Sequence, residues 1–295
     1  MQLQIEGLSK RYPNGTQALQ NVSLTIPQGM FGLLGPNGAG KSTLMRTLAT
    51  LQEADSGSAR LDSIDVLRDK DDVRKLLGYL PQEFGLYPKV TAETLLSHFA
   101  ELKGIENSRE RRDVVHALLR QTNLWDHRNK PLGSFSGGMK QRFGIAQALL
   151  GNPRLIIVDE PTAGLDPEER VRFHNLLAAI GESVIVILST HIVSDVSDLC
   201  QHMAIIHQGR VHAAGDPTTL VTQLNGRVWR KAIARSELAG YQQRFRVISM
   251  SLFGGRNVIH VLQDEMPEAG FEPVIPDLED LYFATIKGFN SGAAN

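Results

Sequence analysis

The chain has 295 residues, 42% of them hydrophobic and 21% charged, and a formal net charge of −1. That length allows one large domain or two smaller ones, and the charge gives no reason to expect bulk electrostatic binding to nucleic acid or anionic lipid. The single cysteine, Cys200, excludes an intrachain disulfide and a cysteine-based zinc site. No apolar run approaches the ~18 residues that span a bilayer, and no signal-peptide pattern is present, so we expect any membrane role to be peripheral.

Residues 1–30 are predicted to be rich in β-strand. Apolar and polar residues alternate along 3–5 and again along 22–26, and a Pro-Asn-Gly turn at 13–15 separates the two segments. Tyr12 lies at the edge of that turn, ahead of a glycine-rich loop. By itself it would be a surface tyrosine at a loop, and only its position ahead of the glycine-rich loop raises a second interpretation, a flat platform for an adenine ring.

The glycine-rich loop, Gly35–Thr43, fits the pattern G-x-x-x-x-G-K-[ST]. It follows an apolar run at 30–34 and precedes a helix-like run at 43–48, which is the strand-loop-helix context that the pattern requires. Glycines let backbone N–H groups turn inward, the helix presents its positive end, and Lys41 adds a mobile ammonium. Ser42 is placed to ligate Mg²⁺. We therefore favour a polyphosphate site over a plain glycine-rich turn.

Residues 59–65 predict a short strand, 69–77 a polar helix, and 76–80 a strand that stops at Pro81-Gln82. From about residue 91 to residue 150 the pattern is helical throughout.

Within the helical stretch, four apolar residues are expected on one face, namely Leu95, Leu96, Phe99 and Leu102. Ser108 and Glu110 give a helix-start signal. This block predicts an all-helical insertion.

Ser136-Gly137-Gly138 opens onto a further predicted helix and forms a possible second anion-binding helix N-terminus. Alone it is a weak signal, because Ser-Gly-Gly is also ordinary loop chemistry.

The apolar run 155–158 predicts a central strand buried on both faces, and it ends in Asp159 and Glu160. Carboxylates at the C-terminal edge of a parallel sheet lie where α/β proteins bind ligands. Asp159 can hold the hydration shell of Mg²⁺, while Glu160 can polarise a water. A second buried strand, 184–188, leads to His191 at the same predicted edge.

Residues 204–211 predict a final hairpin of the main domain. The segment that follows predicts two strands at 245–252 and 258–262 and a helix with one apolar face at 278–286. This segment shows no catalytic constellation, which favours an accessory folding or interaction domain.

In this order the motifs resemble the nucleotide-binding subunit of an ABC transporter, over about residues 1–220. The resemblance identifies an aromatic A-loop, a Walker A loop, a Q-loop, a signature, a Walker B strand, a D-loop and a switch histidine. It implies a P-loop NTPase α/β core with an N-terminal antiparallel β subdomain, a helical subdomain at about 84–150, and a small α+β C-terminal domain at 221–295. Residues 83–87 and the small C-terminal domain look most like the exporter-type branch.

The resemblance implies a role for each matching residue. Glu160 would be the general base, His191 and Lys41 would hold phosphate, and Gln82 with Ser42 and Asp159 would organise Mg²⁺ through water. The ATP-binding residues would be Tyr12, Gly35, Pro36, Asn37, Gly38, Ala39, Gly40, Lys41, Ser42, Thr43, Ser136, Gly137, Gly138 and Asp166. The signature departs from the usual Leu-Ser-Gly-Gly-Gln at Phe135 and Met139, yet retains the Ser-Gly-Gly that contacts phosphate in the family.

The implied partners are a separate membrane permease and a second ABC ATPase subunit, identical or different, with no nucleic acid. The chain would lie on the cytoplasmic face of the cell membrane and power export. A soluble ABC ATPase acting on ribosomes or DNA is the alternative, and a catalytically silent ATP-binding module is a second. The transported substrate is not readable from these motifs.

Overall fold

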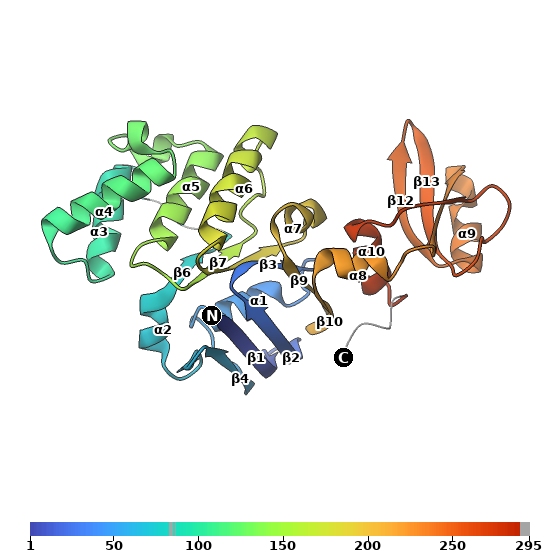
Figure 1. Ribbon diagram of the computed structural model, residues 1–295, viewed down its shortest axis with the longest axis horizontal. Coiled ribbons are helices and arrows are strands. Elements are labelled where there is room, and N and C mark those ends of the chain that lie inside the picture. The colour runs from blue at the N-terminus through green and yellow to red at the C-terminus, as the bar shows by residue number, and fades with distance from the viewer. Residues whose placement is uncertain (83–84, 86, 290–295) are drawn as a thin grey trace.

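The computed structural model describes residues 1–82, 85 and 87–289 and contains three β-sheets with helices between and around them (Figure 1). Within these residues, no helix is both long and apolar enough to cross a membrane. The segment 83–87, which resembles exporter-type proteins in sequence, lies partly outside the described residues, because 83, 84 and 86 are among those not described.

The first sheet is antiparallel and has the strand order β2-β1-β4-β5. Its strands are β1 (Gln2–Arg11), β2 (Gln17–Pro27), β4 (Ser56–Leu61) and β5 (Ile64–Asp65). The alternation of the N-terminal strands places their apolar residues in one core with helix α1 (Lys41–Leu48). The single strand expected at 59–65 is a tight hairpin of β4 and β5, because Asp62 adopts a positive φ of 51° and reverses the chain.

The central sheet has the order β10-β9-β3-β8-β7-β6, in which every pair is parallel except β10 with β9. Its strands are β3 (Gly29–Leu34), β6 (Leu77–Leu80), β7 (Leu155–Asp159), β8 (Ile185–Thr190), β9 (His202–His207) and β10 (Arg210–Gly215). Because parallel strands end at the same edge, the segments that follow β3, β6, β7 and β8 meet there.

Helices cover both faces of the central sheet. Helix α1 and the antiparallel sheet pack on one face. On the other face lie α5 (Gly137–Ala148), α6 (Pro167–Gly181) and α7 (Val193–Leu199). Helix α2 (Lys70–Leu76) precedes the edge strand β6.

The predicted helical block is present and contains α3 (Ala92–Leu102), α4 (Ser108–Gln121) and α5, with short 3₁₀ turns at Trp125–His127 and Leu132–Ser134. The helix-start signal is confirmed, since α4 begins at Ser108; its cap is Asn107, whose side chain accepts from two backbone N–H groups. Leu102, the last residue of α3, is 70% exposed, whereas Leu95 and Leu96 are buried.

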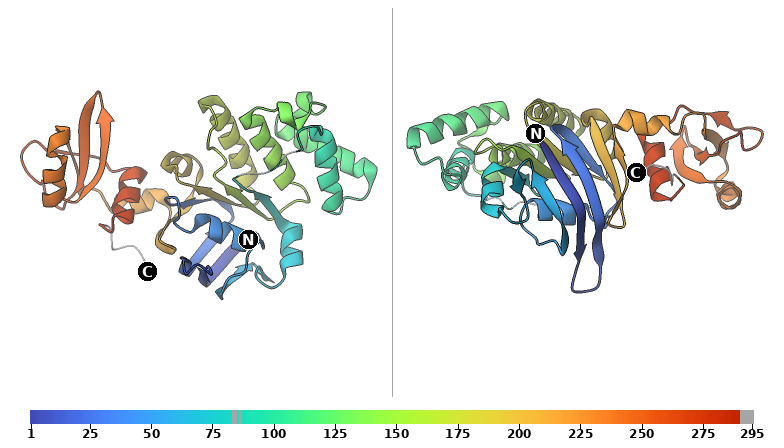
Figure 2. Two further views of the ribbon diagram at one scale, coloured as in Figure 1. Left: turned by 180° about the vertical axis from the view of Figure 1, so that it is seen from behind. Right: turned by 60° about the horizontal axis from the view of Figure 1, so that its bottom comes forward.

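The C-terminal segment has more strands than expected. Its sheet, β12-β13-β11-β14, consists of β11 (Val228–Ile233), β12 (Val247–Phe253), β13 (Arg256–Leu262) and β14 (Glu272–Pro273), and it has an apolar cluster of its own with α9 (Leu238–Arg244). The small sheet and the helical block lie at opposite ends of the molecule (Figure 2).

Two further helices of this segment, α8 (Pro217–Thr222) and α10 (Leu278–Ile286), contribute to the apolar cluster of the central sheet. The boundary at residue 220 stays a proposal.

Candidate nucleotide-binding site

The loop between β3 and α1 forms the wall of a cavity of about 740 Å³. Gly40 has a φ of 109°, and a Cβ there would lie 2.5 Å from the carbonyl oxygen of Ala18; a Cβ on Gly35 would lie 2.3 Å from that of Ile206. Only glycine fits both positions, because any other side chain would collide with the backbone of a neighbouring segment. The lining residues are Tyr12, Thr16, Gln17, Ala18, Gln20, Pro36, Asn37, Gly38, Ala39, Gly40, Lys41, Ser42, Thr43, Gln82, Glu160 and Gln208.

Lys41, the first residue of α1, is held inside the loop and is only 4% exposed. Its Nζ donates to the carbonyl oxygens of Gly35 at 2.7 Å and Pro36 at 3.3 Å, and lies 3.5 Å from Glu160 Oε1. Burial lowers the pKa of the Lys41 amine, and the Glu160 carboxylate opposes that shift. The ammonium is therefore oriented into the cavity by two carbonyls of the same loop.

Glu160 joins three of the predicted catalytic residues in one cluster. Its Oε1 lies 3.2 Å from Nδ1 of His191 as well as 3.5 Å from Lys41, and its Oε2 accepts from Nε2 of Gln82 at 3.3 Å. The residue directly follows β7 and has a φ of 48°, a left-handed conformation that costs a non-glycine residue on the order of 1–3 kcal/mol. The fold thus brings Lys41, Gln82, Glu160 and His191 together, from the ends of four parallel strands.

Asp159, the last residue of β7, fits a metal-binding role. It is buried, and its Oδ1 has no hydrogen-bond partner in the part of the chain that the structure describes. Burial raises the pKa of the Asp159 carboxyl, while the hydroxyls of Ser189 and Ser42 partly offset the rise. Within the described ranges no three His, Cys, Asp or Glu side chains gather in a metal-binding cluster. Proteins commonly hold Mg²⁺ by one or two side chains together with substrate phosphates and waters, which is the donor set that Ser42 and Asp159 offer.

Tyr12 follows β1 and lines the cavity with its hydroxyl anchored. The hydroxyl contacts Oγ1 of Thr43 at 3.2 Å and donates to Oε1 of Gln52 at 2.9 Å. The role of its ring as an adenine platform stays a prediction. The glutamines Gln17, Gln20 and Gln208 also line the cavity and were not anticipated, since nothing in their local sequence distinguishes them.

Four predicted ATP-binding residues lie elsewhere. Within the described part of the chain, the cavity lining does not include Ser136, Gly137, Gly138 or Asp166. Ser136 caps α5 by accepting from the backbone N–H of Met139 at 3.2 Å, and Asp166 caps α6 by accepting from that of a residue three positions on at 2.9 Å. These residues therefore form a second surface, at the N-termini of two adjacent helices.

The chain is similar in sequence to known proteins over most of its length. Residues 19–163 match the family described as "ABC transporter". The chain is 31% identical over 96% of its length to the probable multidrug ABC transporter ATP-binding protein YbhF of Escherichia coli, and spans 52% of that protein. It is 32% identical over 88% of its length to the linearmycin resistance ATP-binding protein LnrL of Bacillus subtilis, and spans 83% of it. The chain thus covers about half of the first relative and most of the second.

A solved structure of similar fold bears on the chemistry. The post-hydrolysis dimer of the ATP-binding cassette MJ0796 with ADP and Pi superposes with a TM-score of 0.66 at 27% identity, and the alignment covers 72% of this chain and 98% of that one.

Proposed function

Since the chain belongs to the ATP-binding proteins of ABC transporters, a family of ATPases, we propose that it hydrolyses ATP in a closed dimer and thereby powers export through a separate membrane permease. The carboxylate of Glu160 carries this proposal, because it contacts Lys41, Gln82 and His191 beside the P-loop cavity. The ATP-binding role follows from family membership, whereas the role proposed for each residue in hydrolysis rests on these contacts.

Hydrolysis of the terminal phosphate is mainly a matter of positioning and charge neutralisation. Glu160 takes the proton of the attacking water, whose oxygen forms the new bond to the γ-phosphorus as the bond to the β-phosphate oxygen breaks. Gln82 and His191 both contact the carboxylate of Glu160. Through that carboxylate they orient the attacking water and the γ-phosphate. Lys41 and the loop amides neutralise the charge on the phosphate oxygens.

Ser42 and Asp159 would hold Mg²⁺, which would supply positive charge against the charge that develops on the phosphate oxygens. Ser42 offers a hydroxyl, and Asp159 offers a buried carboxylate oxygen that has no other hydrogen-bond partner among the described residues. Gln82 contributes an amide at the rim of the same cavity.

The surface formed by Ser136, Gly137, Gly138 and Asp166 serves the nucleotide of a second subunit. These residues are not part of the cavity in their own chain as far as the structure describes it. Backbone N–H groups at a helix N-terminus attract a phosphate, so the start of α5 covers the γ-phosphate from across the interface. Two subunits, identical or different, then enclose two ATP molecules, and hydrolysis removes the phosphate that both halves hold.

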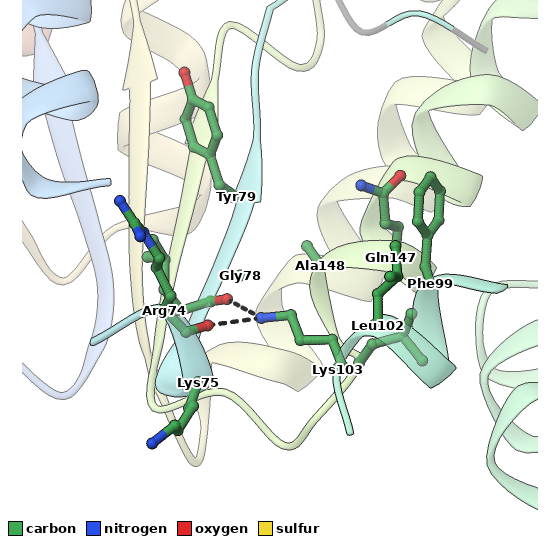
Figure 3. Close-up of a pocket in the computed structure, with 11 residues that line it drawn as sticks. Arg74, Lys75, Gly78, Tyr79, Phe99, Leu102, Lys103, Gln147 and Ala148 are labelled. Atoms are coloured by element: carbon green, nitrogen blue, oxygen red, sulfur yellow. Dashed lines mark hydrogen bonds between the residues drawn. The ribbon is translucent and has the colours of Figure 1, made fainter. Parts of the chain in front are cut away.

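The permease is proposed to dock in a cavity of about 470 Å³ between the edge strand β6 and the helical block (Figure 3). Phe99 and the exposed Leu102 supply apolar surface to this cavity. Lys103 also lines it, and its Nζ donates to the carbonyl oxygens of Arg74 and Leu77 at 2.9 and 2.8 Å. The basic side chains around this groove favour a partner segment with acidic residues. Because β6 leads directly to Gln82, a partner seated here is linked to the hydrolytic cluster by a few residues.

We further propose that the subunit works at the cytoplasmic face of the cell membrane, where ATP is available, and that its cargo is a drug or natural product. The names of its relatives support this direction of transport, since they include a multidrug and a linearmycin resistance protein.

Glu160→Gln tests the proposed mechanism. The variant keeps the size of the side chain and a hydrogen-bond acceptor but cannot take a proton, so phosphate release is expected to fall by roughly 10²- to 10⁴-fold while ATP affinity is retained. Size-exclusion chromatography with ATP is expected to show a stable dimer for the variant and a monomer for the parent. Near-normal steady-state hydrolysis in Glu160→Gln would contradict the assignment.

A further inference from the structure

A fully buried carboxylate, Asp195, connects the two chain segments that carry Glu160 and His191. It lies on the first turn of α7. Its Oδ2 accepts a hydrogen bond from Oγ1 of Thr162 at 2.6 Å and another from Oγ1 of Thr190 at 3.2 Å. Thr162 is two residues beyond Glu160, and Thr190 directly precedes His191. One oxygen atom therefore holds both segments.

The other oxygen of Asp195 holds helix α6. Its Oδ1 accepts from Nε and Nη2 of Arg170 at 2.9 and 2.6 Å and lies 3.0 Å from Nε2 of His174. A buried charge is costly unless it is paired and hydrogen-bonded, and here both oxygens are satisfied. Since α6 begins directly after the loop that ends at Asp166, the same carboxylate also anchors the far end of that loop.

The backbone around His191 is fixed on both sides of the residue. Oγ1 of Thr190 accepts from the backbone N–H of Ile192 at 3.0 Å while it donates to Asp195, and the backbone N–H of Asp195 donates to the carbonyl of Ile192 at 3.2 Å. The His191 side chain itself is 45% exposed and contacts only the Glu160 carboxylate among the described ion pairs. Its placement therefore depends on the backbone that these bonds hold.

The Glu160 segment is tied to the same strand end. The backbone N–H of Glu160 donates to the carbonyl of Ser189 at 2.8 Å, and the hydroxyls of Thr162 and Thr190 meet on Asp195. The two segments are thus joined on either side of the Glu160–His191 contact, which measures 3.2 Å.

We propose that Asp195 is a positioning residue for ATP hydrolysis, which sets the relative placement of Glu160 and His191 by holding the hydroxyls of Thr162 and Thr190. This inference rests on the proposed function. Asp195 contacts neither the P-loop nor the cavity lining in the described part of the chain. Its influence on the reaction is therefore transmitted through the two threonines. Lys41 is held by the carbonyls of Gly35 and Pro36, and the P-loop contacts Thr190 only through its backbone carbonyl, which accepts from the N–H of Gly35 at 3.3 Å and is kept when the side chain is replaced.

Removing the two hydroxyls separately distinguishes positioning from simple stabilisation. In Thr162→Val and Thr190→Val the shape of the side chain is kept and the hydrogen bond to Asp195 is lost. We expect each variant of the full chain to lose roughly tenfold or more in kcat, because small misplacements of catalytic groups have effects of that order. The ATP dissociation constant is expected to stay within about twofold of the parent, since uniform binding is untouched. Thr190→Ser, which retains the hydroxyl, should restore kcat.

Asp280→Asn is the matched control. Asp280 is also a buried aspartate that pairs with a histidine, with Oδ1 2.7 Å from Nδ1 of His260, but it lies on α10 in the C-terminal segment. We expect this variant to lower the melting temperature and to leave kcat unchanged. Asp195→Asn is expected to lower both, with a loss in kcat at least as large as that of Thr190→Val.

Two results would overturn the inference. One is a kcat within about twofold of the parent in both threonine-to-valine variants, which would leave Asp195 a structural ion pair. The other is an equal loss of kcat in Asp280→Asn at a similar melting temperature, which would attribute the effect to stability. A parent chain that releases no phosphate, or an active Glu160→Gln, would instead overturn the proposed function, and this inference with it.

Discussion

Replacement of the P-loop lysine should weaken ATP binding far more than it weakens the fold. Lys41→Ala removes an ammonium that donates to two loop carbonyls and lies 3.5 Å from Glu160. In the complex with ATP the same ammonium would donate to phosphate oxygens. A hydrogen bond between charged groups contributes about 1.5–3 kcal/mol, so loss of two such bonds costs at least about 3 kcal/mol. At 1.4 kcal/mol per tenfold, the ATP dissociation constant should rise at least roughly a hundredfold.

Isothermal titration of the purified chain with ATP and Mg²⁺ measures this change, and Lys103→Ala provides the control. Lys103 is a half-buried lysine whose Nζ, like that of the buried Lys41, donates to two backbone carbonyls, and burial lowers the pKa of both amines. It lies outside the nucleotide cavity, so its replacement should destabilise the chain without changing the affinity for ATP. An ATP dissociation constant that rises less than about threefold in Lys41→Ala would refute the reasoning, because a single neutral hydrogen bond could account for it.

Two further outcomes are expected. His260 has a raised pKa because it is hydrogen-bonded to Asp280, so the stability from this pair is fully present below the unfolded value of about 6.5 and is lost as pH rises through the folded value. Melting temperatures from pH 5.5 to 9 should show that loss in the parent and not in His260→Gln, and parallel curves for the two would contradict it. Leu102→Glu should reduce recovery of the membrane partner with the tagged chain by roughly tenfold or more, since burial of a leucine contributes about 1.5–3 kcal/mol. Leu252→Glu changes a similarly exposed leucine on β12 and should leave recovery of the partner unchanged. Equal recovery of the partner with both variants would argue against the groove as the docking site.

Much of the phosphate site could be predicted from the sequence because its parts are contiguous. The loop Gly35–Thr43 makes its own geometry, through glycines at special backbone angles and the helix that starts at Lys41. The strand that ends in Asp159 and Glu160 was likewise recognisable as an apolar run followed by carboxylates.

The contacts among the predicted catalytic residues depend on strand order. Gln82 and Glu160 are 78 positions apart in the chain and meet because β6 lies beside β7 in the sheet. His191 reaches Glu160 because β8 is the other neighbour of β7. The spacing of motifs along the chain does not tell how far apart such residues lie in the fold, because parallel strands that pair can be far apart in the sequence.

The sequence by itself predicted the glycine-rich loop, the carboxylates that follow strand β7 and most of the helices and strands of the first 220 residues, because each depends on residues close together in the chain. Only the tertiary structure decided that Gln208 lines the cavity, that Leu102 faces solvent, that α10 packs against the central sheet, and that Asp195 links Thr162 to Thr190. These facts depend on which surfaces far apart in sequence are buried together. Such burial is set by the packing of the whole chain, and no short stretch of residues encodes it.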